Sequence, residues 1–383
     1  MTAAMRIGID AREAFRPEPR GIGLYVRHLV REFSALARNE QFLLYHQLPA
    51  PGGLTLPANM QARHTDMRGG RLHAWERLQM PWRIRRDRLD VYHGTYNTLP
   101  PRWRWWRGPP MVVSLHDVIV TWWPDDLADP FVRYARAVTP RVVRDAALIL
   151  TVSEWSRRDI CARFDVDPAK VRLSLNGLHP EVLAGAPPGA GDAARTRWAG
   201  SRPYLFAIGA PLERKNTGRL LDAWALVRAR RPDWPHLLLV SGLGKSVERF
   251  RERAAKAGVL PHVRFLPYLS QQDLIAVYTG AALSVYPSLI EGWGIPVCES
   301  LALGTPVVTS NTSAMPEAGG DDARYFDPND VEAMATAIVD AVETWVPAWP
   351  GRRSAAVARA RTFTWSRTAE GVLAAYRDAA ASG

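Results

Sequence analysis

Short apolar runs alternate with helix-length intervals along the whole 383-residue chain, and this alternation restricts the fold more than any other feature. In the first half, the runs predict strands at residues 6–10, 41–47, 91–93, 111–115 and 148–152. In the second half, they predict strands at residues 204–208, 236–240, 263–266, 283–286 and 306–309. Strands that alternate with helices form parallel sheets with helices on both faces. The sequence therefore predicts an α/β fold with two doubly wound, Rossmann-like domains.

One stretch rich in Ala, Gly and Pro, at residues 183–202, interrupts this alternation. The chain is also longer than a single compact core usually allows, which favours two domains. We therefore expect an N-terminal domain over residues 1–182, a linker over 183–202 and a C-terminal domain over 203–350. The remaining residues, 351–383, are expected to form a helical segment that crosses back to the N-terminal domain.

Composition excludes several classes of protein. With two cysteines, Cys161 and Cys298, the chain has neither a disulfide framework nor a cysteine-based zinc site. No stretch approaches the roughly 18–20 consecutive apolar residues of a transmembrane helix. The N-terminal residues lack a long apolar signal region. We expect a protein of the cytoplasm.

The net charge of +11 is concentrated in one segment. Residues 63–107 contain 11 Arg and four acidic residues, and five Trp are interleaved with them. Arg and Trp together suit a nucleic acid, an anionic membrane or an acidic substrate, although a solvated basic surface would look the same. Within this segment, residues 100–110 place Trp103, Trp105 and Trp106 among three Arg, and we expect them to contact an anionic membrane surface.

The densest candidate site is residues 288–308, SLIEGWGIPVCESLALGTPVV. A turn through Gly292 and Gly294 follows a predicted strand, and Pro296 suits the first turn of a helix. The free N–H groups at such a helix start favour an anion such as phosphate. Two carboxylates, Glu291 and Glu299, are expected to stay ionised there and to accept hydrogen bonds from hydroxyl groups. A glycine turn with a capping carboxylate is the structural alternative.

Two cations, Arg214 and Lys215, follow the first predicted strand of the C-terminal domain. Arginine can bind phosphate oxygens through two N–H groups, and lysine supplies a compact charge. The chain has four Lys and 45 Arg, so a lysine at this position is unexpected for an ordinary surface. Two solvated residues at a helix start are the alternative.

Two glycine-containing loops do not match known nucleotide motifs. Gly21 and Gly23 follow the first predicted strand, but the third glycine of a dinucleotide fingerprint is absent. Gly242 begins a Gly-Leu-Gly-Lys-Ser sequence, but Leu239 stands where a P-loop requires glycine. His116 and Asp117 follow another apolar run, where a histidine is often a satisfied structural residue.

The spacing of Glu291 and Glu299 resembles the E-x7-E motif of retaining glycosyltransferases with the GT-B fold, of the glycosyltransferase family 4 type. The resemblance extends almost continuously over residues 286–317. Upstream, Ile208–Asn216 (IGAPLERKN) resembles the Gly…Arg-Lys-Asn segment of the same family. The aromatic stretch at 363–369 is similar to one near the C-terminus of family members. The resemblance implies two Rossmann-like domains that face a central cleft.

The resemblance also implies roles for individual residues. The nucleotide-sugar donor would be bound by residues of both glycine-containing segments and the E-x7-E motif: Gly21, Gly23, Gly209, Arg214, Lys215, Gly242, Gly292, Trp293, Gly294, Ile295 and Glu299. Glu299 would bind ribose hydroxyls and Glu291 sugar hydroxyls. The catalytic residues would be His116, Asp117 and Glu291, with His116 close to the donor sugar. No cofactor and no metal ion are expected, because the two cations take the place of a metal.

The overall pattern is most similar to bacterial mannosyl- and rhamnosyltransferases of this family. We therefore expect transfer of mannose from GDP-mannose, with retention of configuration, to a glycan or lipid-linked saccharide in cell-surface polysaccharide synthesis. A rhamnosyl- or glucosyltransferase of the same fold is the alternative. A glycoside hydrolase using Glu291 and Glu299, and a nucleic-acid-binding protein, are alternatives of other classes. Nucleic acid is not an expected partner, and we expect a cytoplasmic protein that binds peripherally to the inner membrane face.

Overall fold

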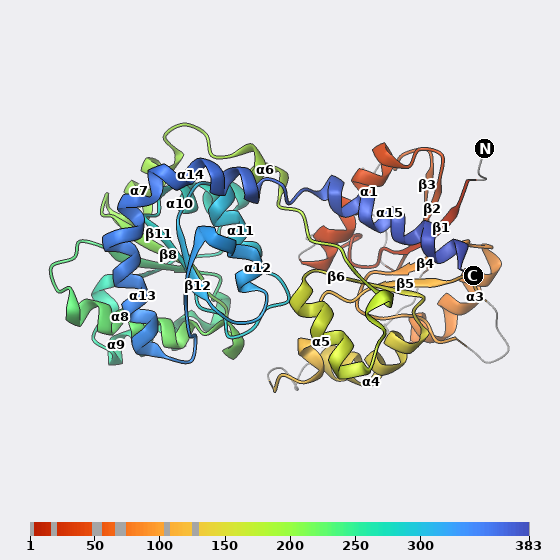
Figure 1. Cartoon of the computed structure of the whole chain (residues 1–383), viewed down its shortest axis with the longest axis horizontal. Coiled ribbons are helices and arrows are strands. Elements are labelled where there is room, and N and C mark those ends of the chain that lie inside the picture. The colour runs from red at the N-terminus through yellow and green to blue at the C-terminus, as the bar shows by residue number, and fades with distance from the viewer. Residues whose placement is uncertain are drawn as a thin grey trace. The chain divides into compact units, whose positions relative to one another are not determined.

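The structure is a computed structural model that describes residues 4–16, 21–47, 56–65, 74–102, 108–124 and 130–382. The chain forms two compact units. The first unit comprises Met1–Gly177 and Thr364–Gly383, and the second comprises Leu178–Phe363. Each unit contains one sheet with helices packed around it (Figure 1).

The sheet of the first unit has seven strands in the order β3-β2-β1-β4-β5-β6-β7. All of its neighbouring strands are parallel. The strands are β1 (Arg6–Asp10), β2 (Gln41–His46), β3 (Met60–His64), β4 (Val91–Gly94), β5 (Met111–Ser114), β6 (Leu148–Thr151) and β7 (Val171–Leu173). The order of connection reverses between β1 and β4, which is where open parallel sheets commonly bind ligands.

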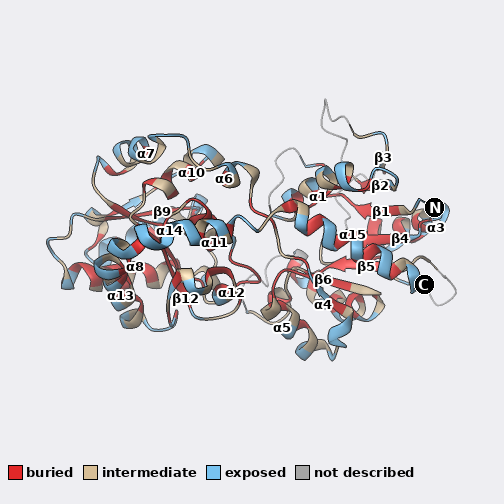
Figure 2. Ribbon diagram, turned by 45° about the horizontal axis from the view of Figure 1, so that its top comes forward, coloured by how far each residue is buried: buried red, intermediate tan, exposed pale blue. Residues whose placement is uncertain are grey.

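Two buried clusters cover the two faces of this sheet, because successive side chains of a strand point to opposite faces. One cluster joins β1 to α1 (Ile22–Leu36) and α15 (Trp365–Ala381). The other joins β5 to α3 (Met80–Arg86), α4 (Pro130–Asp145) and α5 (Glu154–Phe164). A π-helical turn, η1 (Trp75–Gln79), leads into α3. The five interior strands of this sheet are almost entirely buried (Figure 2).

The sheet of the second unit has six parallel strands in the order β10-β9-β8-β11-β12-β13. They are β8 (Tyr204–Ile208), β9 (Leu237–Ser241), β10 (Val263–Phe265), β11 (Leu283–Tyr286), β12 (Val307–Ser310) and β13 (Ala323–Phe326). The helices are α6 (Pro180–Ala184), α7 (Ala190–Ala199), α8 (Thr217–Arg230), α9 (Val247–Lys256), α10 (Gln271–Gly280), α11 (Ile295–Ala302), α12 (Met315–Gly319), α13 (Val331–Asp340) and α14 (Val346–Ala360). The order reverses between β8 and β11, so the loops after these strands form the expected ligand-binding edge.

The predicted fold class is confirmed, and each of the ten predicted strands is present within a residue or two. The structure contains three further strands, β3, β7 and β13, and each lies at an edge of its sheet. Edge strands carry more exposed side chains: in β7 only Val171 is buried, and in β3 only Met60. These strands therefore lack the continuous apolar run on which the prediction depended.

The expected linker at residues 183–202 instead contains α7, which packs against α10 within the second unit. Four of the ten residues of α7 are alanine, the residue with the highest helix propensity, and Ala194 and Ala199 are buried. The expected C-terminal segment, 351–383, is divided between the units, with α14 in the second and α15 in the first. No helix in the described ranges is long and apolar enough to cross a bilayer.

Candidate functional site

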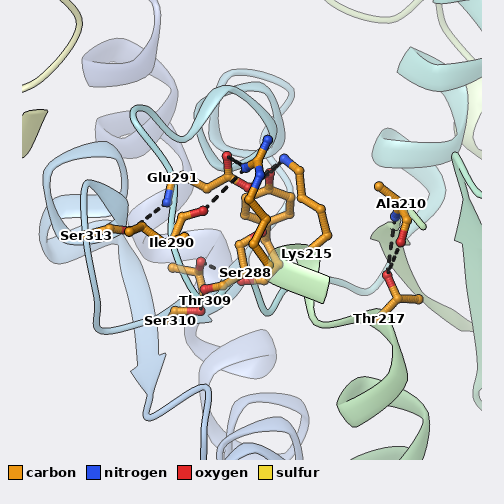
Figure 3. Close-up of polar contacts among 11 residues, drawn as sticks. Ala210, Lys215, Thr217, Ser288, Ile290, Glu291, Thr309, Ser310 and Ser313 are labelled. Atoms are coloured by element: carbon orange, nitrogen blue, oxygen red, sulfur yellow. Dashed lines mark hydrogen bonds and ion pairs between the residues drawn. The ribbon is translucent and has the colours of Figure 1, made fainter. Parts of the chain in front are cut away.

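Three side chains predicted for the donor site form one ion cluster beyond the carboxyl ends of β8 and β11 (Figure 3). The Glu291 carboxylate accepts hydrogen bonds from Lys215 Nζ at 2.5 Å and from an Arg214 guanidinium nitrogen at 3.0 Å. The Tyr286 hydroxyl donates to the same carboxylate at 2.9 Å and accepts from Lys215 Nζ at 2.9 Å. Two cations and one carboxylate give these groups a net charge of +1.

Burial and ion pairing act in opposite directions on Glu291 and Lys215. Burial alone would raise the pKa of Glu291, which is 7% exposed, but the charges of Lys215 and Arg214 outweigh it and lower that pKa. Burial acts to lower the pKa of Lys215, whereas Tyr286 and Glu291 raise it, and the net shift is upward. Both groups are therefore charged at neutral pH, as expected for Glu291 from the sequence.

Four side-chain hydroxyls from β12 and the following loop hold the backbone around Glu291, and Figure 3 shows those of Thr309, Ser310 and Ser313. Three of them donate to carbonyl oxygens of residues 286–289, at 2.5–2.9 Å, and belong to Thr309, Ser310 and Thr312. The fourth, Ser313, accepts from the backbone N–H of Glu291 at 3.0 Å. Because these bonds satisfy the polar groups of a buried loop, they fix the position from which Glu291 projects.

Asn216 joins the loop after β8 to the loop after β11. Its side-chain amide donates to the carbonyl oxygens of Pro287 at 3.0 Å and Pro328 at 2.7 Å. Its backbone has φ 59°, in the left-handed region that asparagine tolerates better than most residues. Asn216 therefore holds the two preceding cations beside the Glu291 loop.

Helix α11 begins directly after the Glu291 turn, with Gly294 as N-cap and Pro296 in its first turn, as the sequence predicts. The first N–H groups of a helix lack intrahelical partners and carry partial positive charge, so this end favours an anion. A Cβ atom on Gly294 would lie 2.6 Å from the Cβ of Ala318, so only glycine fits between α11 and α12. The turn thus needs Gly294 for packing, whatever it binds.

Three further predicted binding residues belong to this turn, and the two large ones differ in their surroundings. Trp293, which follows Gly292, is 8% exposed and packs edge-on against Phe363 with ring centroids 5.4 Å apart. Its indole N–H has no hydrogen-bond partner among the described residues. Ile295, the first residue of α11, is 38% exposed. Trp293 therefore packs the turn against Phe363 of the same unit, whereas the side chain of Ile295 lies at the surface of the unit.

Glu299, the fifth residue of α11, is a buried carboxyl group, 8% exposed. No hydrogen bond or ion pair joins its side chain to any other described residue. Burial raises the pKa of Glu299 to about 7. At neutral pH Glu299 is therefore only partly ionised, unlike Glu291, because no cation offsets its burial.

The raised pKa of Glu299 predicts a pH-dependent gain in stability for Glu299→Gln. The folded-state pKa, about 7, exceeds the ordinary value of 4.5, so wild-type stability falls as pH rises through this window. Because glutamine has no charge to lose, the variant should match the wild type near pH 5 and exceed its free energy of unfolding by about 1–3 kcal/mol at pH 8. Urea unfolding measures the free energy of unfolding of both proteins at pH 5 and pH 8. A difference between variant and wild type that is the same at the two pH values would contradict this prediction.

Gly209 and Gly242, which follow β8 and β9, lie against one another. A Cβ atom on Gly242 would lie 2.5 Å from the carbonyl oxygen of Gly209, and Gly242 has φ 89°. Glycine is therefore required at Gly242 both by the backbone conformation and by the close approach of the two loops. Contact of either residue with a nucleotide stays a prediction.

In the first unit, His116 follows β5 and meets the ring of Tyr25 edge-on, with centroids 4.7 Å apart. Burial lowers the pKa of His116 to about 4, although a backbone hydrogen bond with Thr95 acts to raise it. The imidazole is therefore neutral at pH 7. Its Nε2 atom is buried and has no hydrogen-bond partner within the described ranges.

The start of α1 lies beside His116. Gly21 is the N-cap of α1, with φ 47°, and Gly23 is buried in its first turn. Tyr25, in the same turn, shares a hydrogen bond of 2.8 Å with Ser114 at the end of β5. The glycine-containing loop and His116, predicted from separate motifs, therefore belong to one region of the first unit.

Asp117 has a structural contact. Its carboxylate accepts from the backbone N–H of Ile119 at 3.0 Å, at the start of the short 3-10 turn η2 (Ile119–Thr121). A catalytic role for Asp117 stays a prediction.

Several residues of the site were not predicted from the sequence. They are Tyr25, Asn216, Tyr286, Thr309, Ser310, Thr312 and Ser313. Asn216 directly follows the two predicted cations, and the hydroxyl residues cluster in the segment VVTSNTS, so both carried a signal. Tyr25 and Tyr286 carried none, because their roles depend on which strands are neighbours.

A pocket of about 550 Å³ opens beside this site, between the loop at 211–213, the first turn of α8 and α9. Its lining includes Arg219, Arg249 and Lys256, but neither Glu291 nor Glu299. Since neither the ion cluster nor Glu299 of α11 lines it, we place the candidate site at the ion cluster and not in this pocket.

Each half of the chain matches the model of a known protein family. Residues 19–182 match the family described as Glycosyltransferase Family 4, and residues 192–361 match the family described as Glycosyl transferases group 1. The ion cluster and α11 lie within the second match, and His116 lies within the first.

Individual proteins are similar to this chain in sequence or in fold. The O-antigen chain mannosyltransferase B of Escherichia coli is 27% identical over 96% of this chain and 99% of its own length. Sucrose-phosphate synthase from Thermosynechococcus elongatus has a similar fold, with a TM-score of 0.73 at 17% identity over 99% of this chain and 100% of that one. HepE of Anabaena, solved with UDP and glucose, has a TM-score of 0.70 at 14% identity over 98% and 100% of the two chains.

Both family matches, the relative that spans nearly the whole chain and the two parallel sheets agree with the resemblance found in the sequence. The chain belongs to the glycosyltransferases of the GT-B fold, with a Glycosyltransferase Family 4 domain followed by a Glycosyl transferases group 1 domain.

Proposed function

We propose that this glycosyltransferase moves a sugar from a nucleoside diphosphate donor to an acceptor hydroxyl and retains the configuration at the anomeric carbon. The observation that carries the proposal is the ion cluster of Arg214, Lys215 and Glu291 beside the start of α11. It lies at the point where the strand order of the second sheet reverses, between β8 and β11.

The cluster suits a leaving diphosphate. Its net charge of +1 and the partial positive charge of the α11 N-terminus both favour the negative charge that develops as the sugar departs. Such preorganised charges are usually the largest contribution to catalysis of this kind. Within the described ranges, no group of three or more His, Cys, Asp or Glu side chains is arranged to hold a metal ion. In the proposal, Arg214 and Lys215 supply the charge that a metal would otherwise supply.

The reaction needs no covalent intermediate with the protein. The bond between the anomeric carbon and the donor phosphate breaks, and the acceptor oxygen bonds to the same face of that carbon. The acceptor proton passes to an oxygen of the departing phosphate. Glu291 positions the sugar by accepting hydroxyl hydrogen bonds, and neutral His116 offers Nε2 to the donor sugar.

The ribose of the donor is assigned to Glu299. A carboxyl group that has no partner among the described residues can accept hydrogen bonds from two adjacent hydroxyls. These bonds favour the ionised carboxylate, so donor binding lowers the pKa of Glu299 and releases a proton.

A glycoside hydrolase also needs two carboxyl groups with different pKa values, and Glu291 and Glu299 differ in this way. However, the Glu291 carboxylate is held by Lys215, Arg214 and Tyr286, which makes it a poor nucleophile. A hydrolase would also leave the positive charge of the cluster without a role. We therefore favour transfer.

For the donor we propose GDP-mannose, and for the acceptor a glycan or lipid-linked saccharide of a cell-surface polysaccharide. Support comes from the Escherichia coli relative, whose name describes an O-antigen chain mannosyltransferase. A location in the cytoplasm, at the inner face of the membrane, is part of the same proposal.

A donor panel tests the proposal. Release of nucleoside diphosphate is measured with GDP-mannose, UDP-glucose and dTDP-rhamnose, each with and without EDTA. We expect GDP-mannose to give the fastest release and EDTA to leave the rate within about twofold, since Arg214 and Lys215 supply the positive charge. Release from none of the donors, or a strict requirement for Mn²⁺ or Mg²⁺, would contradict the proposal.

A further inference from the structure

A helical segment of the first unit, η1 followed by α3, exposes two large apolar side chains. Leu78 is 64% exposed and Trp82 is 60% exposed. They are four residues apart, so they lie on the same side of the segment. The opposite side is buried in the core of the unit through Trp75, Met80 and Ile84. Packing within the unit therefore accounts for one side only.

Exposed arginines flank these two side chains. We define the α3 face as Arg77, Leu78, Trp82, Arg85 and Arg86, all of which are exposed. The guanidinium of Arg86 lies 5.2 Å from the centroid of the Trp82 ring. A planar cation stacked on an indole presents charge and an aromatic surface side by side.

The acidic residues next to the α3 face do not neutralise it. Glu76 is fully buried and forms an ion pair of 2.8 Å with Arg12. The Asp87 carboxylate accepts a hydrogen bond from the Tyr45 hydroxyl at 2.7 Å. The α3 face itself thus has three positive charges and no carboxylate.

We propose that the α3 face docks the protein on an anionic lipid bilayer. Indole rings favour the headgroup region, leucine enters the acyl boundary, and arginines bind lipid phosphates while their stems stay apolar. A second copy of this chain fits poorly, because a symmetric contact would place like charges opposite one another. Charge complementarity therefore selects a negatively charged, partly apolar partner, which is the surface of an anionic membrane.

This surface differs from the one expected from the sequence. Trp103, Trp105 and Trp106, predicted to contact a membrane, lie outside the described residues. The α3 face lies in the same Arg-rich segment, residues 63–107, and the structure describes all five of its side chains. The proposal does not depend on donor chemistry, so it is tested without donor.

Two double variants test the α3 face by co-sedimentation with vesicles of phosphatidylcholine containing 30% phosphatidylglycerol. Leu78→Ala/Trp82→Ala removes the apolar contacts, and Arg85→Glu/Arg86→Glu reverses two charges. We expect the wild type to bind these vesicles at low salt, to release them as salt rises, and to ignore pure phosphatidylcholine. Each double variant should bind on the order of tenfold more weakly.

A matched control separates the α3 face from net charge. Arg31→Glu/Arg38→Glu reverses two exposed arginines of α1 and its C-terminal end, and so changes the net charge by the same amount. This control should bind like the wild type. Equal loss in the control and in Arg85→Glu/Arg86→Glu would overturn the proposal, because binding would then follow net charge alone.

Two further measurements complete the test. The thermal midpoints of all variants should stay within a few degrees of the wild type, because the substituted side chains are exposed. Wild-type protein that ignores the anionic vesicles overturns the proposal, and a dimer that dissociates in Leu78→Ala/Trp82→Ala would assign the face to a second copy instead. Release of nucleoside diphosphate by the same variants reports on the donor site separately, and should be unchanged.

Discussion

Replacing Lys215 with alanine is expected to lower kcat/KM for sugar transfer about 100-fold or more. In the proposed mechanism, Lys215 supplies one of the two positive charges that stabilise the leaving diphosphate next to the α11 N-terminus. The exposed Lys256 of α9 provides a matched control, and Lys256→Ala should keep its activity within about twofold. Rates of nucleoside diphosphate release under subsaturating donor measure both variants.

A second variant separates the loss of charge from a loss of folding. In Lys215→Ala, the buried Glu291 loses one of its two cationic partners, so we expect a loss of about 1–3 kcal/mol in the free energy of unfolding. The double variant Lys215→Ala/Glu291→Gln removes the uncompensated carboxylate and should recover stability but not activity. Lys215→Ala with wild-type activity, or a double variant with restored activity, would contradict the assigned role.

Glu299→Gln is expected to lower kcat/KM about 100-fold, although it raises stability at pH 8. A residue whose replacement stabilises the fold and removes activity serves a ligand and not the fold. The neutral amide keeps one acceptor oxygen but cannot provide a carboxylate for two ribose hydroxyls. Steady-state kinetics with GDP-mannose measure the loss.

The pH dependence gives Glu299 a second test. Because the donor favours the ionised carboxylate and the free pKa is about 7, the wild-type KM for donor should fall between pH 6 and pH 8. In Glu299→Gln the KM should be flat over the same range. A wild-type KM that rises with pH, or a variant that keeps the wild-type profile, would contradict the assignment of ribose to Glu299.

Interior strands were predictable because they are buried and their residues are mostly apolar. β8 and β11, for example, have the bounds that the sequence predicts. Edge strands such as β7 and β13 were not, since exposed residues interrupt their apolar pattern. The stretch at 183–202 was misread because alanine and glycine are common both in linkers and in closely packed helices.

For the site, the sequence predicted which residues take part but not how they interact. Glu291 and Lys215 are 76 residues apart, and they meet because β8 and β11 are neighbours in the sheet. The difference in ionisation between Glu299 and Glu291 was not predictable for a related reason. Its pKa depends on which charges surround it in the folded unit, and local sequence does not specify that a cation lies near Glu291 but not near Glu299.

Titration calorimetry of GDP at pH 8 tests whether the second unit binds the nucleotide of a sugar donor. We expect saturable binding to the wild type, with a dissociation constant between about 1 µM and 1 mM. We also expect Lys215→Ala/Glu299→Gln to bind at least tenfold more weakly. A wild-type protein that binds none of GDP, UDP and ADP, or a double variant that binds GDP as tightly as the wild type, would contradict the placement of the nucleotide in this unit.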